Sequence, residues 1–301
     1  MNFSISTCSP SPTELKKFIE NLSTRRRRID YLYKQANRYS LWFIKENRII
    51  ALLGGIRINR SLEAWYWEIA HETNIAQGIL LRQALGHLFK HMSPKSILWY
   101  PKLPHSEARI LRKLKFEPLK ELNMILPLEN FKKRTFLLPE AYKIKSWHNR
   151  YTGKAAKLNF LCNKETISSL VTISLQTPPG CLENLQRLIK NEKFIGGHTL
   201  WHKNQLVGYH LAEKENKLLL LNSLAVHPAH RGKGLGKALF IHTINQFGVK
   251  PFSEAGLGVY DRNRAALNIY RKAGFKTRDS STFYFYALSP DFLRGFNRLE
   301  L

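Results

Sequence analysis

The chain has 301 residues, with 48 Lys or Arg against 22 Asp or Glu, a formal net charge of +26 and an ordinary apolar fraction of 44%. This length suits two domains whose cores are large enough to fold without disulfides or metals. No apolar run is long enough to span a membrane, and the first residues lack the charged and apolar regions of a secretory signal. We therefore expect a cytoplasmic protein without a membrane span.

The three cysteines, Cys8, Cys162 and Cys181, are scattered along the chain and odd in number. This spacing predicts neither a disulfide framework nor a metal site, and it is typical of a protein from a reducing compartment. We expect the cysteines to act as small hydrophobic residues, and we expect no bound metal.

The positive charge is spread over both halves of the chain and is not confined to a tail. A field of this sign favours an acidic partner such as RNA, the ribosome, DNA, an anionic membrane surface or an acidic protein. The alternative is that the charge serves solubility or reflects a generally basic proteome. The run Arg25–Arg28 has two similar interpretations, a nucleic-acid or membrane contact and a solvated helix face or loop, and the second is favoured.

In the first half, Ser11 and Glu14 precede an amphipathic pattern and predict a capped helix that ends near Leu22. Apolar runs separated by turn residues then predict a hairpin, a third strand, a helix, a strand, a helix and a last strand. The ranges are 40–44 and 48–56 for the hairpin, then 64–70, 79–89, 96–100, 106–114 and 122–126.

The second half repeats this order of elements. The predicted elements are a hairpin at 198–209, a buried strand at 217–226, a glycine-rich loop, a helix that ends near Gly248, a strand at 256–259, a helix before Gly274 and a strand at 282–287. We predict two tandem copies of one α/β unit. They cover residues 1–135 and 155–301, and a charged connector joins them over 136–154.

Pro228 ends the buried strand, and the loop after it interleaves glycines with cations: Arg231-Gly232-Lys233-Gly234-Leu235-Gly236-Lys237. Glycines let backbone N–H groups approach a ligand without interference from Cβ atoms. The helix start adds unpaired N–H donors and a partial positive charge, which suits a phosphate group. The spacing is neither that of a Walker loop nor that of a dinucleotide-binding fingerprint.

This loop resembles motif A of the GCN5-related N-acetyltransferases, whose signature is Arg/Gln-x-x-Gly-x-Gly/Ala, here Arg231-x-x-Gly234-x-Gly236. A second stretch is similar to motif B of the same family, an Asn-x-x-Ala-x-x-x-Tyr helix followed by Gly-Phe. It runs from Asn263 through Ala266 and Tyr270 to Gly274-Phe275. The resemblance covers about the last half of the chain.

The resemblance implies the α/β (α+β) class with two tandem GNAT-like domains, each a central mixed, mostly antiparallel sheet flanked by helices. It also implies acetyl-CoA as acyl donor and a mobile segment over the acceptor near 177–180. Tyr270 would protonate the departing thiolate, although a tyrosine on a helix is more commonly a core residue. The backbone of Leu224, Ala225 and Val226 would pair with the pantetheine arm. The remaining implied cofactor-binding residues are Arg231, Gly232, Lys233, Gly234, Leu235, Gly236, Lys237 and Asn263.

The first copy lacks these features. Aligning Gln77–Arg82 with Arg231–Gly236 places Leu80 and Arg82 on the two signature glycines, where side chains would block the approach to a pyrophosphate. Leu111 falls where the second copy has Tyr270. We therefore predict that the first copy keeps the fold and binds no CoA. Its role would be structural, or it would bind a partner or shape the acceptor site.

A general base is not evident on the strand before the loop, where members of this family often carry a glutamate. That strand offers Asn222 and Ser223, and neither is a good base at neutral pH. The candidates nearby in sequence are His210, Glu213, Glu215 and His230, or a water relay. The sequence leaves this choice open, and also whether an amine or an oxygen is acylated.

The predicted function is transfer of an acyl group, most simply acetyl from acetyl-CoA, to an amine of an unidentified acceptor by direct attack. One alternative is a non-catalytic CoA-binding module whose basic surface docks on RNA, a ribosome or a protein. Another is a tRNA-dependent aminoacyl transferase. The intact glycine loop speaks against the latter, because that class has no pyrophosphate to hold.

Overall fold

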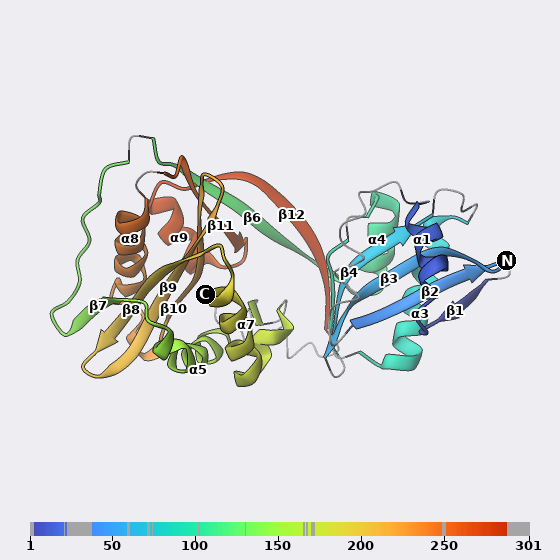
Figure 1. Cartoon of the computed structure of the whole chain (residues 1–301), viewed down its shortest axis with the longest axis horizontal. Helices are drawn as coiled ribbons and strands as arrows, with labels where there is room; N and C mark the ends of the chain where they lie inside the picture. Colours follow the sequence, from blue (N-terminus) through green and yellow to red (C-terminus); the bar gives the residue numbers. More distant parts are fainter. Residues whose placement is uncertain are drawn as a thin grey trace. The chain divides into compact units, whose positions relative to one another are not determined.

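The computed structural model describes residues 3–20, 22, 38–58, 61–70, 73, 75–94, 96–101, 103–129, 131–164, 166, 168–169, 172–248 and 251–287. Arg25–Arg28 lie outside these ranges. The chain forms two compact units (Figure 1). The first runs to Leu119 and takes in the end of the last strand from Thr282, and the second runs from Lys120 to Ser281.

The first unit is a sheet with the strand order β1-β2-β3-β4-β5-β12, in which β4 and β5 are parallel and the other described neighbours are antiparallel. Its elements are β1 (Ser4–Ser6), α1 (Pro12–Glu20), β2 (Arg38–Lys45), β3 (Arg48–Ile58), β4 (Ser61–Ile69), α3 (Gln77–Met92), β5 (Ser96–Trp99), α4 (His105–Lys113) and the end of β12 (Lys276–Ala287).

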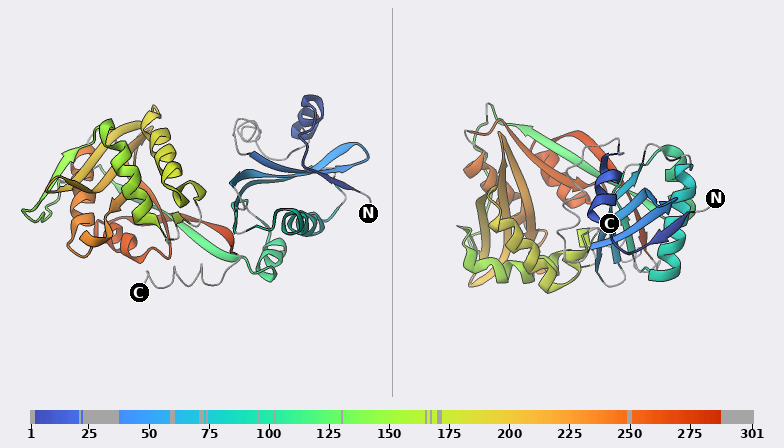
Figure 2. Two further views of the ribbon diagram at one scale, coloured as in Figure 1. Left: turned by 90° about the horizontal axis from the view of Figure 1, so that it is seen from below. Right: turned by 45° about the vertical axis from the view of Figure 1, so that its right-hand side comes forward.

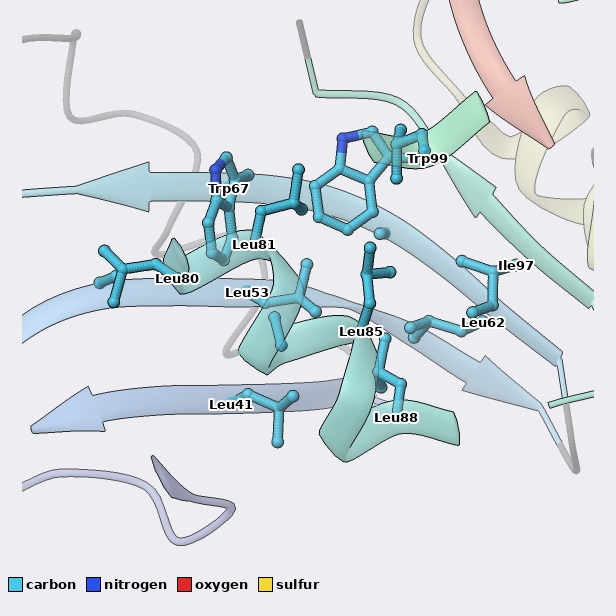
Figure 3. Packing of buried hydrophobic residues seen from close by; sticks show 14 of the residues in the cluster. Leu41, Leu53, Leu62, Trp67, Leu80, Leu81, Leu85, Leu88, Ile97 and Trp99 are labelled. Carbon is cyan, nitrogen blue, oxygen red and sulfur yellow. The ribbon is translucent and has the colours of Figure 1, made fainter. Parts of the chain in front are cut away.

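Strand alternation gives this sheet two apolar faces. Leu41 and Leu53 point to the face that α3 covers, and Figure 3 shows them beneath Leu81 and Leu85 of that helix. Trp42, between them in sequence, packs with Phe18 of α1 on the other face. Figure 2 shows α1 on one side of the sheet and α3 and α4 on the other. The apolar spacing along α3 thus builds the core of the unit.

The second unit has the strand order β6-β11-β10-β9-β8-β7, in which only the pair β10 and β11 is parallel among the described strands. The elements before the glycine loop are β6 (Glu117–Pro127), β7 (Tyr142–Ser146), η1 (Asn149–Tyr151), α5 (Thr152–Asn163), η2 (Ile173–Gln176), α7 (Pro178–Lys190), β8 (Phe194–His202), β9 (Gln205–Glu215) and β10 (Leu218–Val226). The elements that follow β10 are η3 (Pro228–His230), α8 (Leu235–Phe247), β11 (Glu254–Tyr260), α9 (Arg264–Lys272) and the start of β12.

Helices cover both faces of this second sheet as well. Phe240 and Ile241 of α8 and Leu267 of α9 share one core cluster with β10 and β11. Cys162 of α5 and Leu185 of α7 share another with Tyr209, Leu211 and other residues of β8–β10. The predicted class, two units each built on a mixed and mostly antiparallel sheet flanked by helices, is confirmed.

The last strands do not stay within the predicted copies. β6 pairs with β11, with Leu126 opposite Ala255, so it completes the sheet of the second unit. The end of β12 pairs with β5, with Phe285 opposite Leu98, and completes the sheet of the first. The compact units therefore differ from the predicted ranges 1–135 and 155–301. The two last strands are both apolar, and a repeated order of elements does not tell which sheet each one joins.

The predicted connector at 136–154 also differs from a plain linker. Its residues Tyr142–Ser146 form β7, the edge strand of the second sheet, with Tyr142 opposite His202. Tyr142 is buried and packs with Leu235 and Leu239 of α8. Among the described helices, none combines the length and the apolar character needed to cross a membrane.

Candidate functional site

The parallel strands β10 and β11 separate along their length. Their ladder pairs Leu218 to Leu220 with Glu254 to Gly256 and, in these fully described strands, goes no further. β10 continues to Val226, and β11 continues to Tyr260 while it stays paired with β6 on its other side. The backbone of β10 beyond Leu220 is therefore open toward β11. This is the edge at which an extended ligand could add backbone-like hydrogen bonds.

A bulge in β10 lies within this open segment. Asn222 is opposite Leu211 and Ala225 is opposite Tyr209, so two residues of β10 face one residue of β9. Ser223 has a φ of 50°, which is unusual for a residue other than glycine. Of the predicted pantetheine-binding residues, Leu224 lies at the bulge, and Ala225 and Val226 follow it. A bulge twists its strand, which turns these residues away from a regular ladder.

The glycine loop joins β10 to α8 and depends on two left-handed residues. Gly232 has a φ of 78° and Gly234 a φ of 73°, and Gly234 is the N-cap of α8. An added Cβ would meet no atom within 4 Å at either position, so the backbone conformation, not crowding within the protein, requires glycine there.

The start of α8 presents a group of free donors. The N–H of Ala238 reaches the carbonyl of Gly234, whereas no hydrogen bond within the described part of the chain uses the N–H groups of residues 232–237. Lys233 and Lys237 are exposed, and no carboxylate of a described residue lies within 4.0 Å of their ammonium groups. Free donors, the helix dipole and unpaired cations make this a site for a phosphate-like anion.

Arg231 has a different role from the neighbouring lysines. Its Nε donates to the Val226 carbonyl at 3.1 Å, and its Nη2 donates to the Cys162 carbonyl at 3.3 Å. The guanidinium thus ties the glycine loop to the end of β10 and to α5. The resemblance implies cofactor binding for Arg231, and within the protein its contacts clamp the loop to β10 and α5.

Gly236 is required for another reason. A Cβ at this position would lie 3.3 Å from Ile269 Cδ1 and 3.8 Å from Val226 Cγ2. The second residue of α8 therefore lies against α9, next to Tyr270. Close packing of the two helices, and not the approach of a ligand, accounts for this glycine.

Asn263 caps α9. Its side-chain oxygen accepts from the N–H of Ala266 at 3.1 Å, which satisfies a donor of the first turn. This cap explains the Asn-x-x-Ala spacing of the second motif in local terms. It also engages the amide oxygen of Asn263 within the protein, so contact with a cofactor would fall to the amide nitrogen.

Tyr270 lies on the face of α9 that packs against the sheet. Its ring centroid is 5.0 Å from that of Phe240 and 6.3 Å from that of Phe275. Burial raises the pKa of its phenol from 10 to about 12, so the hydroxyl stays protonated throughout the physiological range. The ring belongs to the core cluster that includes residues of β10 and β11, and a protonated phenol there can donate a proton or a hydrogen bond to a leaving group.

The four candidate bases lie in different surroundings. His210 is 1% exposed and stacks on Phe240 on the α8 face, where burial lowers its pKa to about 3. Glu215 is a surface residue paired with Lys193 at 2.7 Å. His230 lies 2.9 Å from the Tyr142 hydroxyl. Glu213 is buried and accepts a hydrogen bond from the side-chain amide of Asn222.

Two contacts near the site are not among those predicted from the sequence. Tyr142, from the predicted connector, contacts His230 and accepts from Lys233 Nζ at 3.4 Å, so it belongs to the surroundings of the glycine loop. Asn222 and Glu213 are nine residues apart on neighbouring strands. The antiparallel register of β9 and β10 could have suggested that pair.

The first unit keeps the framework without the site. In α3, Gly78 is the second residue, and a Cβ there would lie 3.2 Å from Ile110 Cδ1 of α4. Gly78 is thus the counterpart of Gly236, and the sequence alignment that placed Leu80 on Gly234 was wrong by one helical turn. The N-cap is Ala76, with a φ of −57°, and Leu111, next to Ile110, is fully buried at the position of Tyr270.

The cysteines and possible metal ligands give no further site. Cys162 and Cys181 are buried free thiols whose pKa values burial raises, that of Cys181 to about 11. No group of three or more His, Cys, Asp or Glu side chains in the described ranges is arranged to hold a metal ion.

Comparison with known proteins agrees with this geometry. The model of the acetyltransferase (GNAT) domain matches residues 195–277, which run from β8 to the start of β12. A mycothiol acetyltransferase of Renibacterium salmoninarum is 40% identical over 63 residues, which are 21% of this chain and 19% of that protein. The chain therefore matches about a fifth of the length of this relative.

Solved structures show the same fold over nearly the whole chain. A GCN5-related N-acetyltransferase from Sphaerobacter thermophilus aligns with a TM-score of 0.62 and 15% identity, over 96% of both chains. A tandem GNAT protein from the clavulanic acid biosynthesis pathway aligns with a TM-score of 0.57 and 12% identity, over 96% of this chain and 99% of that one. The resemblance to GCN5-related N-acetyltransferases is confirmed.

Proposed function

We propose, from the premise that residues 195–277 form an acetyltransferase (GNAT) domain, that the chain transfers an acyl group from acyl-CoA, with acetyl-CoA as donor, to an amine. One observation carries the proposal. The second unit alone, among the described residues, combines an open strand edge, a loop of free N–H donors and a protonated phenol.

The N–H groups of residues 232–237 would bind the pyrophosphate, with Lys233 and Lys237 adding charge. Arg231 would hold this loop in place through its two carbonyl contacts. The open backbone of β10 around Leu224 would pair with the amide groups of the pantetheine arm, which fixes the thioester between β10 and β11.

The chemistry would be direct attack. A neutral amine forms a bond to the thioester carbonyl carbon, the carbon–sulfur bond breaks, and its electron pair leaves on sulfur. Tyr270 donates a proton to that sulfur. Because burial raises its pKa to about 12, the phenol is protonated at neutral pH and its O–H is available to the developing thiolate.

Two other functions remain as outcomes of a test. A docking module would bind CoA and an acidic partner without turnover, and a tRNA-dependent aminoacyl transferase would need no CoA. The donors of the glycine loop favour acyl-CoA chemistry over the second alternative, since they match a pyrophosphate and have no other partner among the described groups.

The test is incubation of the chain with labelled acetyl-CoA and a panel of primary amines, peptides with free N-termini and tRNA. Label transferred to an amine supports the proposal. CoA binding in a titration without transfer to any member would favour the docking module. Absence of CoA binding would overturn the proposed site.

A further inference from the structure

Glu213 is a buried carboxylate at the end of the parallel ladder. It is 9% exposed and lies on β9 directly opposite Leu220, the last residue of β10 that pairs with β11. Its carboxylate accepts a hydrogen bond from the Asn222 amide, two residues further along β10. The pair therefore lies where the strands begin to separate.

The pair is on the opposite face of the sheet from Tyr270. Along β9, Tyr209 and Leu211 pack with α5 and α7, and Glu213, two residues after Leu211, is on the same face of the sheet. Along β10, Leu219 and Leu221 pack with the α8 and α9 cluster that includes Tyr270. Asn222, the next residue, is therefore on the opposite face, together with Glu213. An acid on one face and a base on the other, with the open strand edge between them, suits an amine that attacks from the α5 and α7 side.

The surroundings of Glu213 leave its carboxylate without a cation. No Lys, Arg or His nitrogen of a described residue lies within 4.0 Å of it. Lys193 acts on Glu213 only across space, because its ammonium group pairs with Glu215. β10 carries no titratable side chain, and the buried titratable groups of α5 and α7 are the thiols of Cys162 and Cys181. An unpaired buried carboxylate is costly for stability, which is typical of a functional group.

We propose that Glu213 is the general base of the acyl transfer and that Asn222 positions it; this rests on the proposed function. The carboxylate takes one proton from the acceptor ammonium. The resulting neutral amine attacks the thioester carbon, the carbon–sulfur bond breaks, and sulfur receives the proton of Tyr270. The second proton lost by the nitrogen restores the phenol, directly or through water, and Glu213 releases its proton to solvent.

In this proposal the base lies on β9, next to β10, the strand on which members of the family often carry a glutamate. Asn222 occupies the strand before the glycine loop, where the resemblance leads one to expect a carboxylate. Its amide orients a carboxylate that β9 supplies instead. Of the other three candidates, His210 lies on the wrong face, Glu215 is in a surface ion pair and His230 contacts Tyr142.

The experiment compares Glu213→Gln with the matched control Glu215→Gln, using labelled acetyl-CoA and the best acceptor amine of the panel. The glutamine keeps an oxygen that can accept from Asn222, so the fold and CoA affinity should be unchanged. At pH 7 we expect kcat to fall by about 10²–10⁴-fold for Glu213→Gln and to stay unchanged for the control. The deficit should shrink as pH approaches the pKa of the amine, about 10, because a free amine needs no base.

Glu213→Asp keeps a carboxylate and should recover part of the activity together with the pH dependence of the wild type. Equal turnover by Glu213→Gln and the wild type, or a deficit that is constant from pH 7 to pH 10, would overturn the role of Glu213 while the transferase proposal stands. Failure of the wild type to acylate any member of the panel would remove both.

Discussion

The two units share the same order of strands and helices and differ in how far the two parallel strands extend beyond their ladder. In the first unit, the parallel ladder between β4 and β5 covers all four residues of β5 and is extended by a bond from the Tyr100 N–H to the Ala64 carbonyl. In the second, β11 runs four residues, 257–260, beyond its ladder with β10. Both strands before the helix carry a bulge, at Trp65 and at Ser223–Leu224. The bulge therefore does not distinguish the two units, whereas the length of β11 beyond the ladder does.

The helix starts repeat this contrast. Gly78 and Gly236 face Ile110 and Ile269 at nearly equal distances, so this glycine belongs to the packing of the fold. The left-handed Gly234 has Ala76 as its counterpart, and Tyr270 has Leu111. The glycine that both units keep packs two helices together. The two positions that differ are those that contact the ligand in our proposal.

Among the changes at positions where the two units differ, removing the phenol should have the largest effect on turnover. Tyr270→Phe should lower kcat by about 10²-fold, the low end for an acid–base group, because a thiolate is a fair leaving group. CoA affinity should barely change, since the ring and its contact with Phe240 remain. The measurement is kcat from pH 6 to pH 10, where the wild type should show no loss from phenol ionisation because its pKa is about 12.

The matched control for that variant is Tyr286→Phe. Tyr286 contacts Phe89 and Phe116 in the first unit, so the same hydroxyl is removed from a copy without the site. Full turnover by Tyr270→Phe would mean that the residue is only part of the core. Equal losses in both variants would point to a general effect on folding.

A smaller effect is expected at the glycine loop. Gly234→Ala should weaken CoA binding by roughly five- to thirtyfold, because a left-handed conformation costs an L-residue about 1–2 kcal/mol. Gly153→Ala is the control, since Gly153 in α5 has open space for a Cβ. Isothermal titration of both variants measures the difference, and equal affinities would show that the loop does not bind the ligand in this form.

Much of the fold and of the glycine loop could be predicted from the sequence, because both depend on local patterns: the apolar periodicity, the strand end at Pro228 and the glycine spacing. The exchange of β6 and β12 between the sheets could not be predicted, because the apolar pattern of each strand fits either sheet. The alignment of Leu80 with Gly234 is wrong because it treats Gly78 as a loop residue, whereas Gly78 is the second residue of α3. Arg231 and Asn263 stand at motif positions that imply ligand binding, and within the protein their contacts are a clamp and a cap.

A separate expected effect concerns stability at low pH, and it again distinguishes the two units. His198 and His210 are buried in the second unit, and burial lowers their pKa values to about 4 and about 3. The unfolded state then binds more protons below pH 6.5, so stability is lost as pH falls from there toward 4. For His198 the loss is on the order of 3 kcal/mol.

Among the described residues of the first unit, no histidine is buried, so acid should unfold the second unit first. Thermal melts at pH 7.5 and pH 5 should show a larger drop for the wild type than for His198→Gln, with His148→Gln at the exposed position as control. A drop that His198→Gln leaves unchanged would assign the acid sensitivity to other groups.

The central claim is that one copy binds the acyl donor and the other does not, and it is tested most directly by titrating CoA into the intact chain. The account predicts a stoichiometry of about one per chain, with an affinity that Gly234→Ala lowers and that Ala76→Ser leaves unchanged. Two equivalent sites, or a single site that responds to Ala76→Ser and not to Gly234→Ala, would contradict it.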